Sequence, residues 1–393
     1  ALPAGHLLRI GADGAVGAPK AFYRVEDAYT AAAAEPISAR ALRDAFVDSV
    51  AYHFVADVTV GVFLSAGVDS TALAALAKEA GFKLHTVTLA FDEFKGTVDD
   101  EAPLAEETAR LLGADHKTVR VSKDEFLGVF DDLMASMDQP TTDGLNTYLV
   151  SRAAASVGLK VVLSGLGGDE LLGGYPSFRQ VPQLVEWGSK LPGRKFLSSA
   201  LDAIGRPIAQ MLNVSPKLAA SLKYSGDFES AYYLRRCLYL PEELDLLVDE
   251  TWSKPGLEEL AALLPGGDPG RTESLEGMSA HAAVSQLEIR KYMRMQPLRD
   301  TDWASMAHSI EVRTPFLDLP LFSKLSPAIA SKRPPSKLDL ADCIGPCVTR
   351  IASRSKTGFS TPVANWLEDR VVKGRGLRPW ADRVATSFRH LPA

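Results

Sequence analysis

The stretch 60–80 constrains the fold of this chain more than any other part of the sequence. Its apolar run 60–64 is typical of a short strand buried on both faces. Its Ala/Leu-rich run 71–78 is typical of a helix packed on a sheet. The small and hydroxyl residues 65–70 join the two in a tight turn. Backbone N–H groups at a helix start point outward and the helix dipole favours negative charge, so this arrangement predicts an anion-binding site.

The residues of this turn make the prediction more specific. Ser65 and Ser70 add hydroxyl donors for an anion. The carboxylate of Asp69 is explained if it holds a divalent cation that bound phosphates share. The turn lacks the Gly-Lys-Ser/Thr ending of a Walker A loop and the Gly-x-Gly-x-x-Gly pattern of a dinucleotide site. An ordinary strand–helix turn with a serine N-cap is the alternative for this stretch taken alone.

Size and composition exclude several classes of protein. The chain has 393 residues, enough for two or three domains at about 150 residues each. Its net charge of −6 does not favour a nucleic-acid partner. No apolar run approaches the ~20 residues that span a bilayer, so we expect no membrane segment. Three cysteines are too few for a disulfide framework, which indicates a cytoplasmic location.

Strand and helix patterns alternate over the first half of the chain. We expect strands at 60–64, 84–91, 117–121 and 160–163, and helices at 38–53, 101–113, 123–137 and 144–157. This alternation predicts an α/β fold with a parallel, doubly wound sheet. Ligands bind beyond the C-terminal ends of such strands, so the segments after Leu64, Leu89 and Leu163 should converge. The inward faces of the first two helices are expected at Leu42, Phe46, Val47 and Val50, and at Leu104, Thr108, Leu111 and Leu112.

The pattern changes after residue 180, where we find no further convincing strand. Helices are expected at 183–190, 194–212, 216–223, 227–237, 241–249, 257–264, 279–295, 302–309 and 339–352, with a polar loop at 268–277. At the other end, strands at 6–10 and 21–25 are expected to form a hairpin. We therefore divide the chain into a remnant or linker (1–35), an α/β core (36–180) and a mainly helical part (181–393) that completes the site.

A second glycine-rich segment, 164–175, follows the fourth expected strand. Its glycines allow a backbone to approach a ligand closely. Asp169 and Glu170 stand where a helix would start, a position that favours negative charge. Asp169 can meet Asp69 across the site, with the two sharing one or two Mg²⁺ ions. A glycine-rich loop with acidic capping is the alternative for this segment alone.

Together these motifs resemble a known family. The turn 65–70 is similar to the Ser-Gly-Gly-x-Asp-Ser signature of pyrophosphatase-loop ATPases, with Ala66 in place of the first Gly. Segment 164–175 resembles the Ser-Gly-x-Gly-x-Asp-Glu-x-x-x-Gly-Tyr segment of asparagine synthetases. Segments 299–318 and 356–362 resemble two further motifs of that family, in the family's order. The resemblance covers residues 60 to about 367 and implies an adenine nucleotide alpha hydrolase-like sheet followed by a helical half.

The resemblance implies an activity and a set of partners. Such enzymes activate a carboxylate on ATP, by default aspartate, releasing pyrophosphate and giving an acyl-adenylate. Ammonia from glutamine then displaces AMP and leaves an amide. Residues 2–23 resemble the stretch that closes the family's glutaminase domain, and the chain begins at Ala1 as if something upstream were absent. We therefore expect a glutaminase domain or subunit upstream. The resemblance is also compatible with a homodimer.

The same resemblance assigns roles by position. Asp69 and Asp169 would hold Mg²⁺, and Lys356 would stabilise charge on the α-phosphate of ATP. Without the resemblance, Lys356 would be interpreted as a solvated surface lysine, as single lysines in loops usually are. Residues expected at ATP are Phe63, Leu64, Ser65, Gly67, Asp69, Ser70, Leu89, Ser164 and Gly165. Residues expected, more weakly, at the carboxylate substrate are Asp143, Asn146, Glu170 and Asp302.

Three residues of segment 299–318 have a structural interpretation beside a functional one. His308 could act as a base, but a single histidine on a helix is more often packed or hydrogen-bonded. Glu311 and Arg313 are expected to form a structural ion pair that ties the helical half to the ATP site.

Two departures from the family leave the acceptor open. Leu166 stands where many asparagine synthetases carry an acid, and residues 141–146 match the family's aspartate pocket poorly. Another carboxylate, such as a uronic acid, is the variant of the default reaction. A second hypothesis is intramolecular lactam formation, as in β-lactam synthetases and lasso-peptide cyclases. A third is a catalytically silent scaffold, against which the two carboxylates and Lys356 argue.

Overall fold

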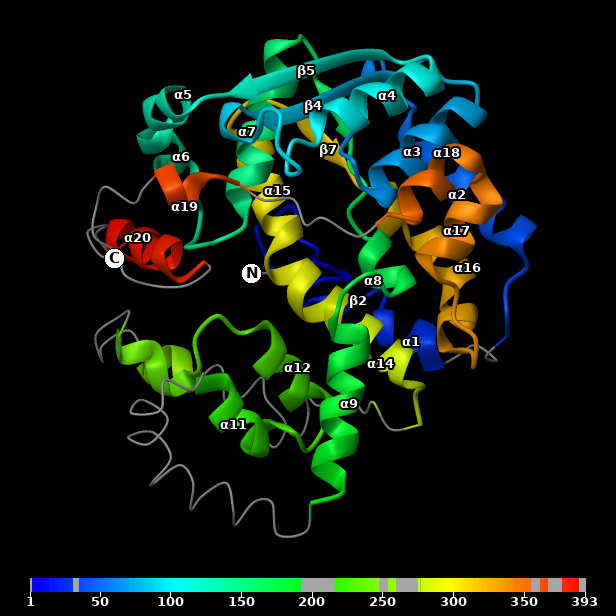
Figure 1. Cartoon of the computed structure of the whole chain (residues 1–393). Helices are drawn as coiled ribbons and strands as arrows, with labels where there is room; N and C mark the ends of the chain where they lie inside the picture. The colour runs from blue at the N-terminus through cyan, green and yellow to red at the C-terminus, as the bar shows by residue number, and fades with distance from the viewer. Residues whose placement is uncertain are drawn as a thin grey trace.

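A parallel sheet of five strands lies in the upper part of the computed structural model as Figure 1 shows it, in the order β5-β4-β3-β6-β7. The strands are β3 (Val60–Phe63), β4 (His85–Phe91), β5 (Asp115–Val121), β6 (Val161–Leu163) and β7 (Glu311–Arg313). The structure describes residues 2–30, 35–191, 216–246, 254–258, 275, 277–354, 361–366 and 377–388. The α/β fold is as predicted.

The fifth strand corrects the sequence analysis, which found no strand after residue 163. Val312 of β7 pairs with Val162 of β6 in parallel register. Three residues are too short to show a period-two pattern, and β7 stands between a helix and a 3-10 turn. It becomes a strand because the edge of β6 offers unpaired backbone groups that β7 satisfies. The helical half therefore contributes directly to the sheet.

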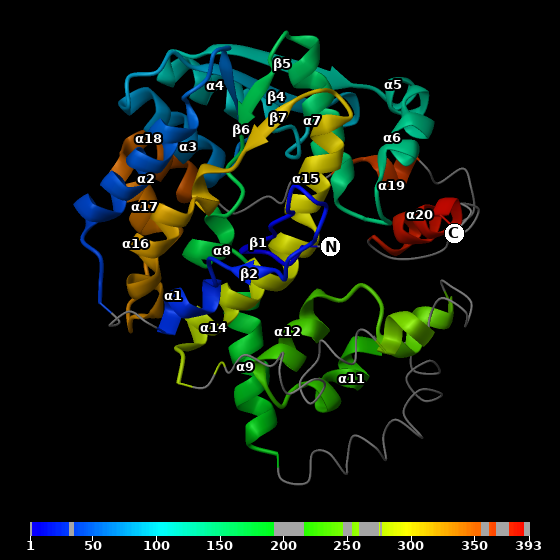
Figure 2. The same ribbon diagram turned by 180° about the vertical axis from the view of Figure 1, so that it is seen from behind.

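Helices cover both faces of the sheet (Figures 1 and 2). One face carries α2 (Ala39–His53), α3 (Val68–Glu79) and α4 (Ala102–Leu112), with α17 (Lys337–Ile344) and α18 (Pro346–Ala352) packed on α2 and α3. The other face carries α7 (Gly144–Ser156), on which α15 (Pro297–Met306) packs. An apolar cluster lies on each face of the sheet, so its inner strands are buried on both sides. This explains why the sequences of these strands are almost continuously apolar.

The first helices agree with the expected boundaries. Ser38 caps α2 by accepting a hydrogen bond from the Ala41 N–H, and Gly113 ends α4 in the left-handed conformation, φ 69°. The inward face of α2 is as expected, but Leu111 of α4 is 47% exposed, contrary to prediction. The buried face of α4 instead follows Ala102, Ala105, Thr108, Ala109 and Leu112, a regular helical spacing that leaves position 111 turned to solvent.

Two predicted helices are each split in two. The segment expected as one helix at 123–137 forms α5 (Lys123–Gly128) and α6 (Phe130–Ser136), with Val129 between them. The segment expected at 339–352 forms α17 and α18, separated by Gly345 at φ 131°. Helical conformation needs negative φ, so the chain must leave the helix at Gly345.

Some of the remaining helices lie in the lower part of Figure 1, and others lie beside the sheet and the helices that cover it. They are α8 (Gly168–Leu172), α9 (Ser177–Ser189), α11 (Pro216–Tyr224), α12 (Phe228–Arg236), η2 (Pro241–Leu246), α14 (Ala280–Leu287), η3 (a π-helix, Glu288–Met293), η4 (Pro315–Leu317), α16 (Leu319–Ala330), α19 (Val363–Trp366) and α20 (Arg378–Phe388). A short helix also covers 254–258. The helix predicted at 194–212, most of the one at 257–264, the end of the one at 241–249 and most of the loop at 268–277 fall on residues that the structure does not describe.

The N-terminal hairpin is shorter than predicted. β1 (His6–Leu7) pairs antiparallel with β2 (Lys20–Ala21), and Val25 starts a helix, α1 (Val25–Thr30), instead of ending a strand. Glu26 and Asp27 favour a helix start at this point. Tyr29 then packs edge-on against Phe322, at 5.3 Å between ring centroids. Packing of Tyr29 thus favours helix over strand in this segment.

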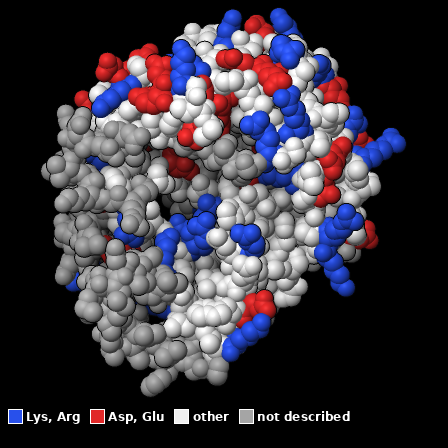
Figure 3. Space-filling model, viewed as in Figure 1, with Lys and Arg blue, Asp and Glu red and all other residues white. Residues whose placement is uncertain are grey.

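Charged residues of both signs are interspersed over the sheet half in Figure 3. This distribution agrees with the modest net charge of −6. Among the described residues, no helix has the length and apolar character required to cross a lipid bilayer.

Candidate active site

A cavity of about 370 Å³ lies at the C-terminal ends of β3, β4 and β6. The strands are parallel, so the segments that follow them meet at one edge of the sheet, as predicted. Residues predicted for ATP that line this cavity are Phe63, Leu64, Ser65, Gly67, Asp69, Ser70, Leu89, Ser164 and Gly165. The structure therefore brings this whole set together, while its role in binding ATP stays a prediction.

The turn 65–70 is held by hydrogen bonds between its own residues. The Ser65 N–H donates to Ser70 Oγ at 3.1 Å, and the Gly67 N–H donates to Ser65 Oγ at 3.1 Å. The two hydroxyl oxygens lie 2.9 Å apart. Helix α3 begins at Val68, and its N-cap residue is Gly67, which has no side chain that could cap it. The alternative of a serine N-cap is therefore wrong, and a helix start of this kind suits an anion.

The second loop packs directly on the first because it is rich in glycine. A Cβ atom at Gly165 would lie 3.0 Å from Asp69 Cβ, and one at Gly168 would overlap Asp69 Oδ1. Gly167 has φ +102°, in the left-handed region that glycine tolerates best. The glycines therefore allow the two loops to approach each other closely, whereas the close approach to a ligand that was expected of them stays a prediction.

Lys337 joins the two carboxylates that the sequence analysis paired. Its ammonium lies 2.6 Å from Asp69 Oδ2 and also contacts Asp169 Oδ1. Burial alone would lower the pKa of Lys337, but the Asp69 and Asp169 carboxylates outweigh burial and raise it. Because both carboxylates reach one nitrogen, they are close enough to hold one cation. Carboxylate oxygens are the ligands that Mg²⁺ prefers, so the pair fits that ion.

Sequence reasoning missed Lys337, although a signal was present. Ser336 and Asp339 form a capping box at the start of α17, which places Lys337 at the first helical position. A cation is unfavourable at this positive end of a helix. A lysine there therefore needs a negative partner from elsewhere in the fold. Lys356, the cation that was predicted, belongs to the part of the chain outside the described ranges.

Two of the weakly predicted substrate residues hold tyrosine hydroxyls at the cavity wall. Glu170 Oε1 accepts from the Tyr175 hydroxyl at 3.0 Å, and Asp143 Oδ2 accepts from the Tyr292 hydroxyl at 2.8 Å. Burial raises the pKa of Glu170 to about 8. Glu170 Oε2 and Asn146 Oδ1 are buried and accept no hydrogen bond within the described structure. Both residues line the cavity, so Asn146 Oδ1 can accept an N–H donor of a bound molecule, and Glu170 Oε2 can do the same when its carboxyl is ionised.

Asp302, the fourth such residue, does not line the cavity and is exposed. Asp300 stands in its place. It is buried, lines the cavity, and accepts from the Thr141 hydroxyl at 2.6 Å and from Trp303 Nε1 at 3.1 Å. Burial raises the pKa of Asp300 to about 6. Whether Asp300 or Asp302 is buried depends on which face of α15 packs on α7. The helical spacing of Pro297, Asp300 and Ala304 identifies that face in retrospect.

A guanidinium supports the two tyrosines of the wall. Arg236 lies 3.8 Å from the ring centroid of Tyr292 and 4.4 Å from that of Tyr175. The same side chain forms an ion pair with fully buried Glu288. Glu288 also accepts from the Tyr232 hydroxyl at 2.8 Å and from the Ser177 hydroxyl. This network connects α12 and the π-helix η3 to the wall, and the sequence analysis did not foresee it.

The other residues singled out in segment 299–318 are structural. His308 packs edge-on against Tyr148 at 4.3 Å and does not line the cavity. Glu311 and Arg313 form the expected ion pair at 2.6 Å. Arg313 also donates to the backbone carbonyl oxygens of His53 and Val55, at 2.8 Å each. Arg313 thus fastens β7 to the end of α2 and the residues that follow it, while the tie to the ATP site that was expected of the pair stays a prediction.

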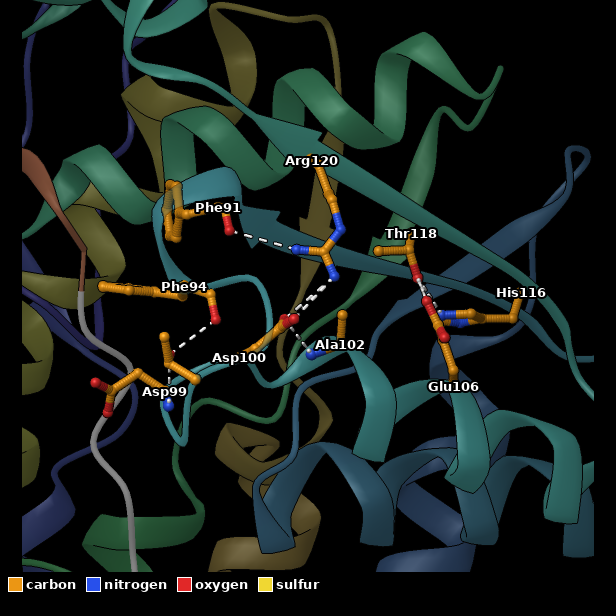
Figure 4. Close-up of polar contacts among 10 residues, drawn as sticks. Phe91, Phe94, Asp99, Asp100, Ala102, Glu106, His116, Thr118 and Arg120 are labelled. Atoms are coloured by element: carbon orange, nitrogen blue, oxygen red, sulfur yellow. Dashed lines mark hydrogen bonds and ion pairs between the residues drawn. The ribbon is translucent and has the colours of Figure 1, made fainter.

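The connection after β4 is held by Arg120 of β5 (Figure 4). Arg120 donates to the Phe91 carbonyl oxygen at 3.3 Å and to Asp100 Oδ2 at 3.0 Å. Asp100 in turn accepts from the Ala102 N–H at 3.2 Å, at the start of α4. Both ends of the connection 92–101 are therefore bound to β5, which keeps the edge of the cavity next to Leu89 in place.

Comparison with known proteins gives one consistent family. The family model described as asparagine synthase matches residues 41–386. A Mycobacterium bovis protein whose name includes asparagine synthetase is 32% identical over 337 residues, covering 81% of this chain and 47% of its own length. Asparagine synthetase 1 of Bacillus subtilis is 28% identical over 340 residues, 84% of this chain and 50% of its own length. Asparagine synthetase B of Escherichia coli is 33% identical over 163 residues, 37% of this chain and 28% of its own length. The chain thus spans about half the length of the first two relatives.

Proposed function

This chain belongs to the asparagine synthase family, and we propose that it activates a carboxylate with ATP and converts it to an amide. The expected resemblance to asparagine synthetases is confirmed by the family match. The observation that carries the proposal is that the turn 65–70, which includes Asp69, meets Asp169 and Lys337 at one edge of a parallel sheet. An uncapped helix start, two carboxylates and an ammonium form a site for a phosphate chain with its cation.

This arrangement supports a proposed position for ATP. The pyrophosphate part belongs at the start of α3, where Ser65 and Ser70 add hydroxyl donors. Phe63 and Leu89, on neighbouring strands, provide apolar surface for the adenine. Mg²⁺, held by Asp69 and Asp169, would supply charge neutralisation of the phosphates. Lys356, predicted from its motif alone, would stabilise the α-phosphate.

The reaction proceeds in two steps. An oxygen of the substrate carboxylate attacks the α-phosphorus, the bond to the β-phosphate oxygen breaks, and pyrophosphate leaves. Ammonia then attacks the carbonyl carbon of the acyl-adenylate, AMP leaves, and one proton is lost from nitrogen. The chain's contribution is to bind both reactants at one edge of the sheet and to stabilise the negative charge that develops on the phosphates.

We propose aspartate as the default acceptor, with another carboxylate as the variant. The wall formed by Asp143, Glu170 and Asn146 presents oxygen acceptors to the cavity. An amino group that donates hydrogen bonds matches these acceptors. Leu166 also lines the cavity and has no polar side-chain atom. Many asparagine synthetases have an acid at this position, so this chain lacks that contact to the substrate or ATP.

The source of ammonia and the assembly are further parts of the proposal. We propose that ammonia comes from a glutaminase domain or subunit, with residues 1–35 as the linking segment, 36–180 as the core and 181–393 completing the site. The names of the relatives in Mycobacterium bovis and Bacillus subtilis specify glutamine hydrolysis. A cytoplasmic location and a homodimer stay predictions from the sequence.

The test is pyrophosphate release with ATP, Mg²⁺ and ammonium, scanned over carboxylates. We expect release with aspartate together with formation of asparagine. Asp69→Asn should reduce release at least about a hundredfold, because it removes a carboxylate from the proposed cation site. Asp302→Asn is the matched control, since Asp302 is exposed outside the cavity, and it should behave as the wild type. Absence of release with every carboxylate would favour the silent scaffold.

A further inference from the structure

Lys337 occupies the position between the two carboxylates that a divalent cation would need. Its ammonium lies 2.6 Å from Asp69 Oδ2 and contacts Asp169 Oδ1. The three side chains are only 17%, 19% and 16% exposed, respectively. Two oxygens from different loops thus converge on one nitrogen in a site that is largely closed to water. Charges there are weakly screened, so each influences the other two strongly.

The fold makes room for this lysine between the loops. A Cβ atom at Gly174 would overlap Asp169 Oδ1 and lie 2.5 Å from Lys337 Cε. A Cβ atom at Gly168 would overlap Asp69 Oδ1. The contact therefore depends on two glycines in one loop and on the capped start of α17. The surface ion pair of Lys324 with Asp48 differs from it, because both of those side chains are more than half exposed to solvent.

An ammonium and a divalent cation cannot both lie at contact distance from the same two oxygens without strong mutual repulsion. We propose that Lys337 acts as a counter-cation that keeps Mg²⁺ alone from binding to Asp69 and Asp169, and that moves onto the phosphates when nucleotide and Mg²⁺ arrive together. This inference rests on the proposed function, because it assigns those two carboxylates to the cation of ATP.

The geometry provides a path for this exchange. Asp69 lies in the first turn of α3, the same helix start that faces the predicted phosphate site. Lys337 has a long flexible stem on a backbone anchored by the Ser336–Asp339 capping box. Phosphate oxygens carry the negative charge that the ammonium needs when it leaves the carboxylates. Binding of nucleotide therefore offsets the loss of the ion pairs, whereas binding of metal alone does not.

The experiment measures Mn²⁺ binding to the nucleotide-free protein by the loss of the free-ion electron paramagnetic resonance signal. We expect Lys337→Met to bind Mn²⁺ about tenfold more tightly than the wild type, or better, because one adjacent positive charge has been removed. Lys324→Met, which removes an exposed ion pair, should bind Mn²⁺ as the wild type does. In Asp69→Asn/Lys337→Met the gain should disappear. Adding ATP should raise the affinity of the wild type for Mn²⁺.

The outcomes separate this inference from the proposed function. Unchanged Mn²⁺ affinity in Lys337→Met overturns the inference, and so does a gain that persists when Asp69 is also replaced. Lys337→Gln, which keeps the length and a polar end, is the second variant if the methionine protein does not fold, and it should show a gain in the same direction. Lack of pyrophosphate release by the wild type with any carboxylate would instead refute the proposed function, and leaves the metal comparison intact.

Discussion

The network around Glu288 gives the most quantitative prediction. Glu288 has no exposed surface, and its ion-pair partner Arg236 is 25% exposed, with Nη2 at 2.5 Å from Glu288 Oε2. Replacing Arg236 by methionine keeps much of the apolar stem and removes the charge. Breaking a buried pair by removing one partner costs ~3–5 kcal/mol, since the remaining charge stays buried without compensation. Ser177 and Tyr232 still donate to Glu288, so the lower end applies, about 3 kcal/mol.

The assay is urea denaturation followed by fluorescence and circular dichroism. For a slope of about 3 kcal/mol per molar urea, a loss of 3 kcal/mol lowers the transition midpoint by about 1 M. Arg235→Met is the matched control, because Arg235 is the neighbouring residue of the same helix and is exposed. We expect the control to change the free energy of unfolding by less than about 0.5 kcal/mol.

The same variant tests the wall of the cavity. Without the guanidinium over their rings, Tyr175 and Tyr292 lose their common support, and with it Glu170 and Asp143 lose their alignment. We expect KM for the carboxylate to rise about tenfold, equivalent to about 1.4 kcal/mol, with KM for ATP nearly unchanged. A loss of stability below about 1 kcal/mol, or an equal effect on both KM values, would refute this reasoning, because Arg236 would then act as an ordinary surface residue.

Further predictions concern the loops and the buried acids. Gly168→Ala should reduce pyrophosphate release strongly with little change in melting temperature, since its Cβ would displace the Asp69 carboxylate; normal release would contradict the loop contact. The pKa of Glu170 is raised in the folded state, so the folded protein binds more protons than the unfolded chain between about pH 4.5 and pH 8, and stability falls with rising pH across that window. Glu170→Gln should flatten this fall when unfolding by urea is measured at several pH values, and an unchanged slope would argue against the raised pKa. Arg120→Met should destabilise the connection 92–101, because Asp100 then loses its ion-pair partner; faster hydrogen exchange of the Ala102 amide would show it, and unchanged exchange would speak against it.

Local patterns in the sequence were sufficient for the strand–turn–helix unit, the parallel sheet and the convergence of the two loops. Each of these depends on short-range properties: apolar runs for β3 and β6, a turn of small and hydroxyl residues before α3, and glycines that allow loops 65–70 and 164–175 to approach. Parallel pairing then places the ends of all such strands at one edge, whatever the rest of the chain does. The family resemblance of the motifs followed from the same short segments.

Only the tertiary structure decided which distant residues join these loops. Lys337 meets Asp69 across 268 positions of sequence, and Arg236 reaches Glu288 and two tyrosine rings from another helix. Strand β7 forms because β6 has a free edge, and Asp300 rather than Asp302 faces the cavity because of how α15 packs. The local signals at Lys337 and Asp300 do not identify the residues that these side chains meet, since a single charge or a three-residue strand is defined by its partners. The sequence alone therefore determined the turn 65–70 and the sheet edge on which it lies, and packing determined that Lys337 and Asp300 lie near it.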